Sequence, residues 1–180
     1  MKKVIGLIIF CALLSACNPE IKEGQTKRYF DLKGLIETQI KTLNKQKPFV
    51  QKTILMSEKM ENQSINTIDW AKELELFIQT DLNKPAFAQS YQVDSSLAGV
   101  KYTLKETEKL PVKYLTISKI GEDTIKVEAL VSNENYLYET ERHLKLAIKN
   151  DIVSDYQIEG FQKIIFGDKK AFKINGIIKR

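Results

Sequence analysis

The sequence predicts an α+β fold, in which two N-terminal helices pack on an antiparallel, mostly meander β-sheet of about six strands. Three observations lead to this expectation. Apolar residues recur every three to four positions in two segments of the first half, as they do on one face of a helix. From residue 99 onward they alternate with polar residues, which is typical of strands with one buried face. The connections between the alternating segments are short, which favours antiparallel neighbours.

The first predicted helix extends from about Phe30 to Lys45. Its apolar face carries Tyr29, Leu32, Ile36, Ile40 and Leu43. Asp31 suits the N-cap position, and Pro48 prevents the helix from continuing. The short β-branched run from Phe49 to Met56 then predicts a strand, and a polar turn is expected from Ser57 to Ser64.

The second predicted helix begins near Thr67 or Asp69. Its apolar face carries Trp70, Leu74, Phe77 and Ile78. The run Asn83-Lys84-Pro85 ends it, because the residue before a proline disfavours the helical conformation. Residues 85–98 show no clear period, so a loop is expected there.

The alternating second half predicts the six strands of the sheet. They cover residues 99–105, 112–120, 125–131, 136–148, 152–166 and 171–178. A sheet with one apolar face must bury it, so the two helices should cover that face. The expected core comprises Ile36, Trp70, Leu74 and Phe77 from the helices, and Val127, Tyr138, Leu144, Leu146 and Ile174 from the sheet. Gly160 and Gly176 interrupt strand patterns and indicate bulges or close packing.

The turn at Asn150-Asp151 raises a question of register. A two-residue loop would place apolar Leu144 opposite polar Gln157, whereas a three-residue loop would place it opposite Tyr156. Because a slip of one residue moves a whole strand to the other face, burial favours the second register. We therefore predict either a three-residue loop or a bulge next to the turn.

The N-terminus has the composition of a secretory signal peptide. Met1-Lys2-Lys3 is basic, Val4 to Leu14 is apolar, and small residues follow. The stretch Leu14-Ser15-Ala16-Cys17 resembles the lipobox of bacterial lipoproteins. The resemblance implies that Cys17 receives a diacylglyceryl group and becomes the first residue of the mature chain, with its new amine acylated. The chain then divides into a signal peptide (1–16), a lipidated tether (17–27) and a single domain (28–180).

Two other interpretations of this N-terminus remain. One is an uncleaved membrane helix, but the apolar run has about 11 residues and a span needs about 20. The other is an ordinary signal peptide cut near Ala16, which would leave a free thiol. The abundance of Lys, Ile and Asn is similar to that of small lipoproteins of Bacteroidota-type envelopes. Asn18 after the cysteine favours the outer membrane in some bacteria. We expect a lipid-anchored envelope protein there, facing the periplasm or the surface.

Composition excludes several classes of site. Loss of residues 1–16 leaves 164 residues and lowers the formal net charge from +5 to +3, which is spread along the chain and gives no nucleic-acid footprint. With Cys11 removed and Cys17 lipidated, no thiol remains for a disulfide or a metal. No cofactor is expected. Lys169, Lys170, Lys173, Lys179 and Arg180 form a basic C-terminal cluster, which either meets anionic lipids or is simply solvated.

No residue is predicted to be catalytic or to bind a metal. His143 is the only histidine and lacks a partner at a suitable spacing, so it should face solvent. Glu139, Glu141, Asp155 and Glu159 alternate with lysines. Paired carboxylates can serve a glycosidase, but on strands such alternation more often solubilises the surface. We therefore expect a protein that is not an enzyme.

Four tyrosines are the candidate ligand-binding residues. Tyr102, Tyr136, Tyr138 and Tyr156 fall on the face assigned to the interior, where they either line a groove for an apolar or sugar ligand or pack at the rim of the core. The favoured function is a membrane-anchored, non-catalytic binding module, with an envelope protein as its possible partner. The alternative is a carrier or chaperone of a lipid or other apolar ligand in a curved-sheet cavity, which must be open, apolar and roughly several hundred Å³ in volume.

Overall fold

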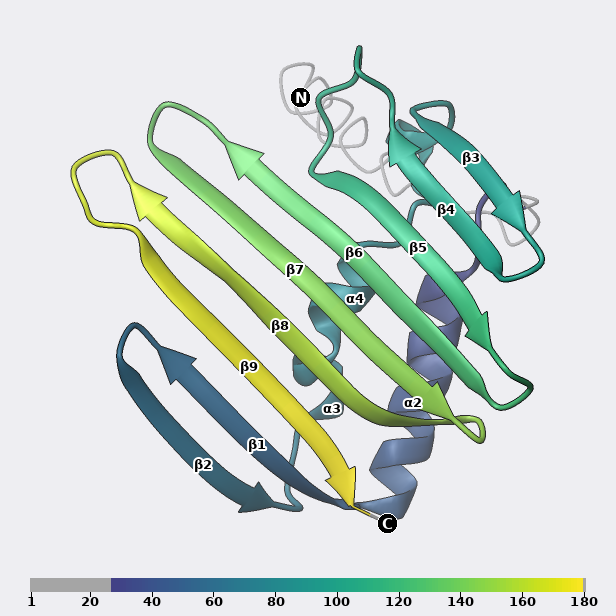
Figure 1. Ribbon diagram of the computed structural model, residues 1–180, viewed down its shortest axis with the longest axis vertical. Helices are drawn as coiled ribbons and strands as arrows, with labels where there is room; N and C mark the ends of the chain where they lie inside the picture. The colour runs from purple at the N-terminus through teal and green to yellow at the C-terminus, as the bar shows by residue number, and fades with distance from the viewer. Residues whose placement is uncertain (1–26, 180) are drawn as a thin grey trace, which may run out of the picture.

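The computed structural model describes residues 27–179 (Figure 1). Within this range one antiparallel sheet of nine strands carries all its helices on one face. The strands are β1 (Phe49–Met56), β2 (Lys59–Ile65), β3 (Tyr91–Ser96), β4 (Gly99–Leu104), β5 (Val112–Ile120), β6 (Thr124–Glu134), β7 (Tyr138–Lys149), β8 (Ile152–Ile164) and β9 (Lys170–Lys179). The helices are α2 (Leu32–Gln46), α3 (Trp70–Glu73), α4 (Glu75–Gln79) and the 3₁₀ turn η2 (Pro85–Phe87).

The strand order is β2-β1-β9-β8-β7-β6-β5-β4-β3. From β3 to β9 each strand lies beside the next one in sequence. The β1–β2 hairpin, which comes earlier in the chain, adds to β9 at the far edge (Figure 1). Strand β9 therefore lies inside the sheet, between β8 and β1.

The predicted architecture of two helices on about six strands is wrong, since the described part of the chain has a nine-stranded sheet and mostly short helices. Residues 57–64 and 85–98 contain the edge strands β2 and β3. Nearly all their side chains are exposed on both faces, so they lack the alternation that reveals a half-buried strand. The second predicted helix is two short pieces, α3 and α4, separated at Leu74, whose φ of −101° and ψ of 7° are not helical.

Helix α2 is confirmed, at Leu32–Gln46. The Asp31 carboxylate accepts a hydrogen bond from the backbone N–H of Gly34 at 3.0 Å, as an N-cap does. The helix ends at Lys47 in the left-handed conformation, and the Lys47 N–H donates to the carbonyl of Leu43. Its buried face presents Leu32, Ile36 and Leu43 to the sheet.

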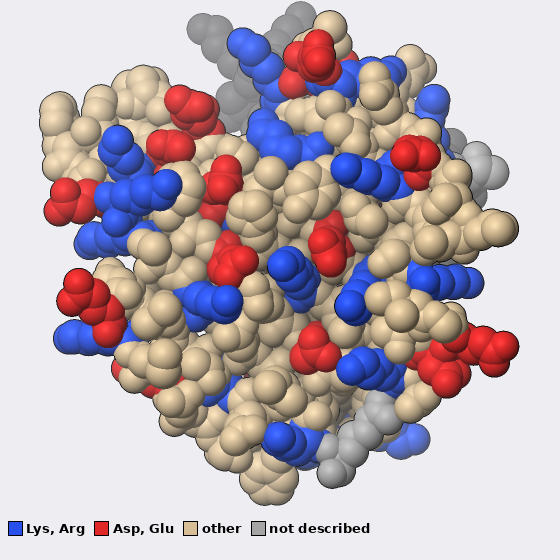
Figure 2. Space-filling model, in the orientation of Figure 1, with Lys and Arg blue, Asp and Glu red and all other residues tan. Residues whose placement is uncertain are grey.

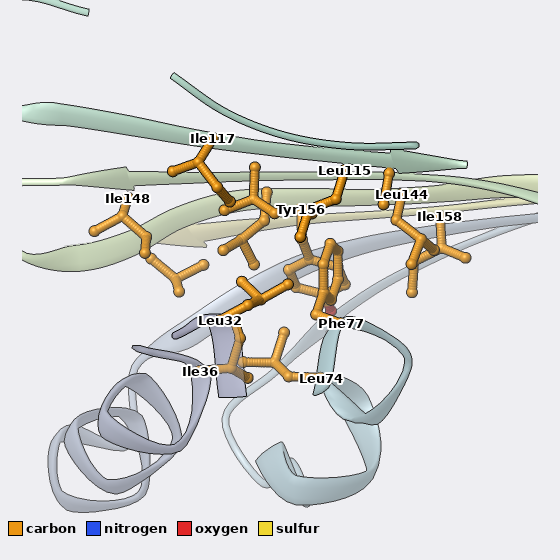
Figure 3. Close-up of a cluster of buried hydrophobic side chains, with 14 of the residues drawn as sticks. Leu32, Ile36, Leu74, Phe77, Leu115, Ile117, Leu144, Ile148, Tyr156 and Ile158 are labelled. Carbon is orange, nitrogen blue, oxygen red and sulfur yellow. The ribbon is translucent and has the colours of Figure 1, made fainter. Parts of the chain in front are cut away.

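The core lies between the helices and the sheet (Figure 3). Leu32 and Ile36 of α2 and the α3–α4 segment point toward side chains from the strands, among them Leu144 and Tyr156. The core residues that are confirmed as buried are Ile36, Trp70, Leu74, Phe77, Val127, Leu144 and Leu146. Ile174 is half-buried. Tyr138 is 41 % exposed, so its assignment to the core is wrong.

The β7–β8 hairpin has a two-residue turn followed by a bulge. Lys149 pairs with Ile152, and Asn150 and Asp151 both have positive φ, as a tight type I′ turn requires. The predicted three-residue loop is therefore wrong, but the predicted bulge is present at Ser154. Beyond it Leu144 pairs with Ile158, so apolar residues share the helix-covered face. The bulge supplies the extra residue that burial demands.

Gln39 of α2 holds this hairpin against the helix. Its side-chain amide donates to the carbonyl of Asp151 at 3.1 Å and accepts from the N–H of Val153 at 3.0 Å. The side chain is buried, so both of its polar ends are satisfied by the turn and the bulge. The later turns of α2 thus lie at the end of the strands where the β7–β8 turn is located.

Candidate functional site

Cys17, the predicted signal peptide and nearly all of the tether lie outside the described residues, so the lipidation site stays a prediction. Among the helices within residues 27–179, none combines the length and the apolar character needed to span a bilayer.

The four candidate tyrosines are not brought together: Tyr136 and Tyr138 line one open hollow of about 190 Å³, and Tyr102 and Tyr156 lie elsewhere. Tyr102 is buried, its hydroxyl accepts a hydrogen bond from the N–H of Phe30 at 3.0 Å, and its ring packs edge-on against Tyr29 with centroids 5.3 Å apart. Tyr156 is also buried, whereas Tyr136 is 80 % exposed and Tyr138 lies at the exposed start of β7. Tyr102 and Tyr156 therefore belong to the core.

Tyr156 takes part in a buried polar cluster. Its hydroxyl donates to Glu73 of α3 at 2.6 Å, and the same carboxylate pairs with Lys52 of β1 at 2.7 Å. Burial, and next the hydrogen bond to Glu73, raise the pKa of Tyr156 well above its usual value. A Cβ at Gly176 would overlap the Tyr156 ring, so the close packing predicted at this glycine is confirmed. This cluster joins two strands to a helix, which is a structural role.

The alternating carboxylates lie on the other face of the sheet. Glu141 is 3.2 Å from His143, and Glu159 pairs with Lys173 at 3.1 Å. The hydrogen bond from Lys173 lowers the pKa of Glu159, which keeps this carboxylate ionised. A glycosidase needs one carboxyl group with a raised pKa, and neither Glu159 nor its surroundings fit that role. Within residues 27–179, no group of three His, Cys, Asp or Glu side chains is placed to hold a metal ion.

The sheet leaves one face free of helices, which Figure 2 shows from the front. Lys and Arg side chains intermingle there with Asp and Glu, so the face has no field of a single sign. One row of paired residues crosses all nine described strands of the sheet with a polar side chain from each. It comprises Asn62, Thr53, Asn175, Gln157, Lys145, Glu128, Thr116, Lys101 and Asp94.

At the β2 end of this row the face is hollowed. The amide groove, as we call it, has a volume of about 440 Å³ and lies over β1, β2 and β9. Its walls on the helix-free face are Gln51, Thr53, Asn62, Ser64, Asn175 and Ile177. The Thr53 hydroxyl donates to the side-chain oxygen of Asn62 at 2.7 Å, which leaves the Asn62 NH₂ group for a ligand. Lys52 also lines the groove, but its ammonium group pairs with Glu73.

A second feature lies at the upper left of Figure 1, where the β6–β7 and β8–β9 loops meet. Six large apolar side chains are exposed there: Tyr136, Leu137, Tyr138, Ile164, Ile165 and Phe166. We call this set the hairpin tip. The Ile165 N–H donates to the Leu137 carbonyl at 2.9 Å, which ties the two loops together. Figure 2 shows this corner as uncharged surface bordered by charged side chains.

Sequence reasoning misses both features for identifiable reasons. The groove draws three residues from Lys59–Ile65, a segment that lacks an apolar alternation and is therefore predicted as a turn. The residues of the hairpin tip fall at the ends of two predicted strands. Their available signal is the pair of apolar triplets, Tyr136–Tyr138 and Ile164–Phe166, placed directly beside turns.

No protein-family model, no curated protein and no solved structure matches this chain. Function is therefore inferred from the chain's own surfaces.

Proposed function

We propose that the protein is a lipid-anchored, non-catalytic binding module of the cell envelope that holds its ligand in the amide groove. The observation that carries this proposal is the chemistry of the groove. Side-chain amides and hydroxyls offer both donors and acceptors without net charge, and Ile177 adds an apolar patch. These groups suit a neutral ligand rich in hydroxyl groups, such as a glycan chain, whose C–H faces can contact Ile177.

Charge supports a neutral ligand over a charged one. Lys52 is the one charged residue among those that line the groove, and its ammonium group already pairs with Glu73 at 2.7 Å. A carboxylate or phosphate in the groove would lose water without gaining a counter-charge, which is costly. A neutral polar ligand exchanges hydrogen bonds with water for equivalent ones with the amides.

The carrier alternative has less support. A carrier would hold its cargo on the apolar face of the sheet, where the helices lie. Buried side chains from α2, α3, α4 and the strands occupy the space shown in Figure 3, and Tyr102 and Tyr156 are packed among them. The helix-free face is the better candidate, because its groove is open to a ligand.

The binding test is titration of the full-length protein in detergent with neutral oligosaccharides, namely β-linked oligomers of glucose and of N-acetylglucosamine. Calorimetry should detect binding, and Asn62→Ala or Asn175→Ala should each weaken it about five- to tenfold by removing hydrogen bonds. Gln92→Ala removes an exposed amide from β3 on the same face and is the matched control. The absence of binding by the whole panel, or equal effects of all three variants, would refute the groove as the glycan site.

The anchor is tested separately. Lipidation at Cys17 would tether the domain to a membrane. We propose that this is the outer membrane and that the domain faces the periplasm or the surface. Cys17→Ala should abolish incorporation of labelled fatty acid and remove the lipid from the mass of the protein. Unchanged mass and unchanged membrane fractionation of the variant would contradict lipidation, whatever the groove binds.

A further inference from the structure

The hairpin tip gathers six exposed apolar side chains in one place, and no described part of the chain covers them. Its six side chains are between 41 % and 96 % exposed, with Phe166 the most exposed. Single exposed apolar residues are common on proteins, but a contiguous cluster of six marks a site of contact. All six come from the two adjacent loops and the strand ends that flank them.

The tip is held in a defined shape. Tyr138 and Ile164 are paired directly across β7 and β8, and the Ile165 N–H donates to the Leu137 carbonyl at 2.9 Å. The Asn135 side chain accepts from the N–H groups of Leu137 at 2.8 Å and Tyr138 at 3.0 Å. A contact that uses this surface therefore needs little ordering of the backbone, which favours binding.

We propose that the hairpin tip inserts into the interface of the bilayer to which the chain is anchored. Tyrosine favours the boundary between headgroups and acyl chains, and phenylalanine, leucine and isoleucine bury their side chains among the acyl chains just below it. The apolar side chains sit at the ends of two hairpins, so they protrude and can enter a soft surface. This inference rests on the proposed function, because it assigns the tip to the anchoring membrane.

The charges around the tip permit this contact. The two loops and the strand ends that flank them carry three acidic residues, Glu134, Glu139 and Asp168, and three lysines, Lys163, Lys169 and Lys170. The formal charges balance, so burial of apolar surface drives insertion into a zwitterionic bilayer. Lys169 lies over the ring of Phe161, 3.4 Å from its centroid.

The length of the proposed tether decides whether the anchor and the tip can meet the same membrane. Gln39 bonds to the β7–β8 turn, so α2 runs toward the end of β7 that lies opposite the tip. The start of α2, close to the first described residue, Lys27, lies on the β4–β5 side of the molecule in Figure 1, whereas the tip lies at the upper left. The ten residues from Cys17 to Thr26 span at most about 35 Å, which is enough for the anchor and the tip to reach one membrane.

The test introduces a reporter at the tip of the full-length protein. Phe166→Trp is reconstituted into phosphatidylcholine vesicles whose acyl chains are brominated near their carbonyl end, since bromine quenches tryptophan only on contact. We expect the added tryptophan to lose about half its emission if it lies at the interface. Leu97→Trp is the matched control, because Leu97 is fully exposed in the β3–β4 turn at the opposite end of the strands. The native Trp70 is 2 % exposed and gives a constant background.

Quenching of Phe166→Trp alone supports the proposal. A shift to shorter wavelength without quenching would mean that a protein or a second copy covers the tip, and it would overturn the proposal. Equal quenching at both positions, or none at either, would also overturn it. None of these quenching results bears on the lipid anchor, which is supported separately if Cys17→Ala loses its lipid. If that variant instead behaves as the wild type, the anchor fails while the quenching still reports on the tip.

Discussion

Tyr156 joins three elements through one side chain. Its ring crosses β9 at Gly176, its hydroxyl bonds to Glu73 of α3, and Glu73 pairs with Lys52 of β1. A largely buried carboxylate is tolerated only when its charge and its lone pairs are matched. Removal of one partner therefore affects the stability of the whole cluster.

Tyr156→Phe keeps the ring but removes the hydroxyl that donates to Glu73. We expect the free energy of unfolding to fall by about 1.5–3 kcal/mol, the range for a hydrogen bond to a charged group. Urea denaturation of the wild type and the variant measures this difference. Tyr136→Phe removes a hydroxyl from a tyrosine that is 80 % exposed and should change almost nothing. Equal effects of the two changes would contradict the assigned role.

The buried tyrosines also predict a dependence on alkaline pH. Burial raises the pKa of Tyr156 and of Tyr91 above the value in the unfolded chain. Above pH of about 10 the unfolded chain loses these protons while the folded protein keeps them. Ionisation of these tyrosines should therefore leave the free energy of unfolding unchanged below that pH and lower it above that pH. Denaturation between neutral and strongly alkaline pH measures the slope, which Tyr156→Phe should reduce.

At the scale of elements, burial on one side decides which parts of the fold can be predicted. Helix α2 and the strands β4 to β9 each have a covered face, and their apolar patterns predict them, whereas β1 is predicted from its short β-branched run. Strands β2 and β3 lie at the two edges, where nearly all of their side chains are exposed, so their polar sequences resemble loops. The amide groove needs β2 beside β1, which explains why its residues could not be grouped from the sequence.

The β7–β8 hairpin shows that polar residues can also determine register. Gln39 lies among apolar neighbours on α2, but its amide satisfies the Asp151 carbonyl and the Val153 N–H. The sequence predicts the need for an extra residue at this hairpin. The choice of a bulge over a longer turn depends on a partner more than 100 residues earlier in the chain.

Gln39→Leu would leave the buried N–H of Val153 without its partner and would remove a donor from the carbonyl of Asp151. The free energy of unfolding should fall by about 1–3 kcal/mol, because one buried unsatisfied group costs its desolvation. Gln46→Leu at the exposed end of the same helix is the control. Thermal or urea unfolding measures both. Similar stabilities for the two variants would show that Gln39 does not hold the hairpin.

At the scale of the molecule, the sheet separates three surfaces with different chemistry. One face packs on helices, the other carries the amide groove, and one end carries the hairpin tip. A ligand in the groove and a membrane at the tip use different surfaces, so changes at one should leave the other unaffected.

The same arrangement predicts a gradient of local stability. Strands β7 and β8 have neighbours on both sides and a covered face, whereas β2 and β3 are exposed edges. Amide hydrogens of β7 and β8 should exchange only through global unfolding, and those of β2 and β3 should exchange faster through local opening. Hydrogen exchange followed by mass spectrometry on proteolytic peptides measures both. Protection of β2 equal to that of β7 would contradict this gradient.

The position of β9 has a consequence for how the chain acquires its fold. A ribosome releases β1 and β2 long before it makes β9, yet β1 pairs with β9, from Phe49 opposite Lys179 to Met56 opposite Phe172. Until β9 is made, one edge of the β1–β2 hairpin has no neighbouring strand, and the contacts that complete the sheet are among the longest in sequence, which slows folding. The protein is proposed to cross a membrane before it folds. Because the ten-residue strand β9 completes the sheet, the chain stays unfolded until β9 is available, which leaves more time for this crossing.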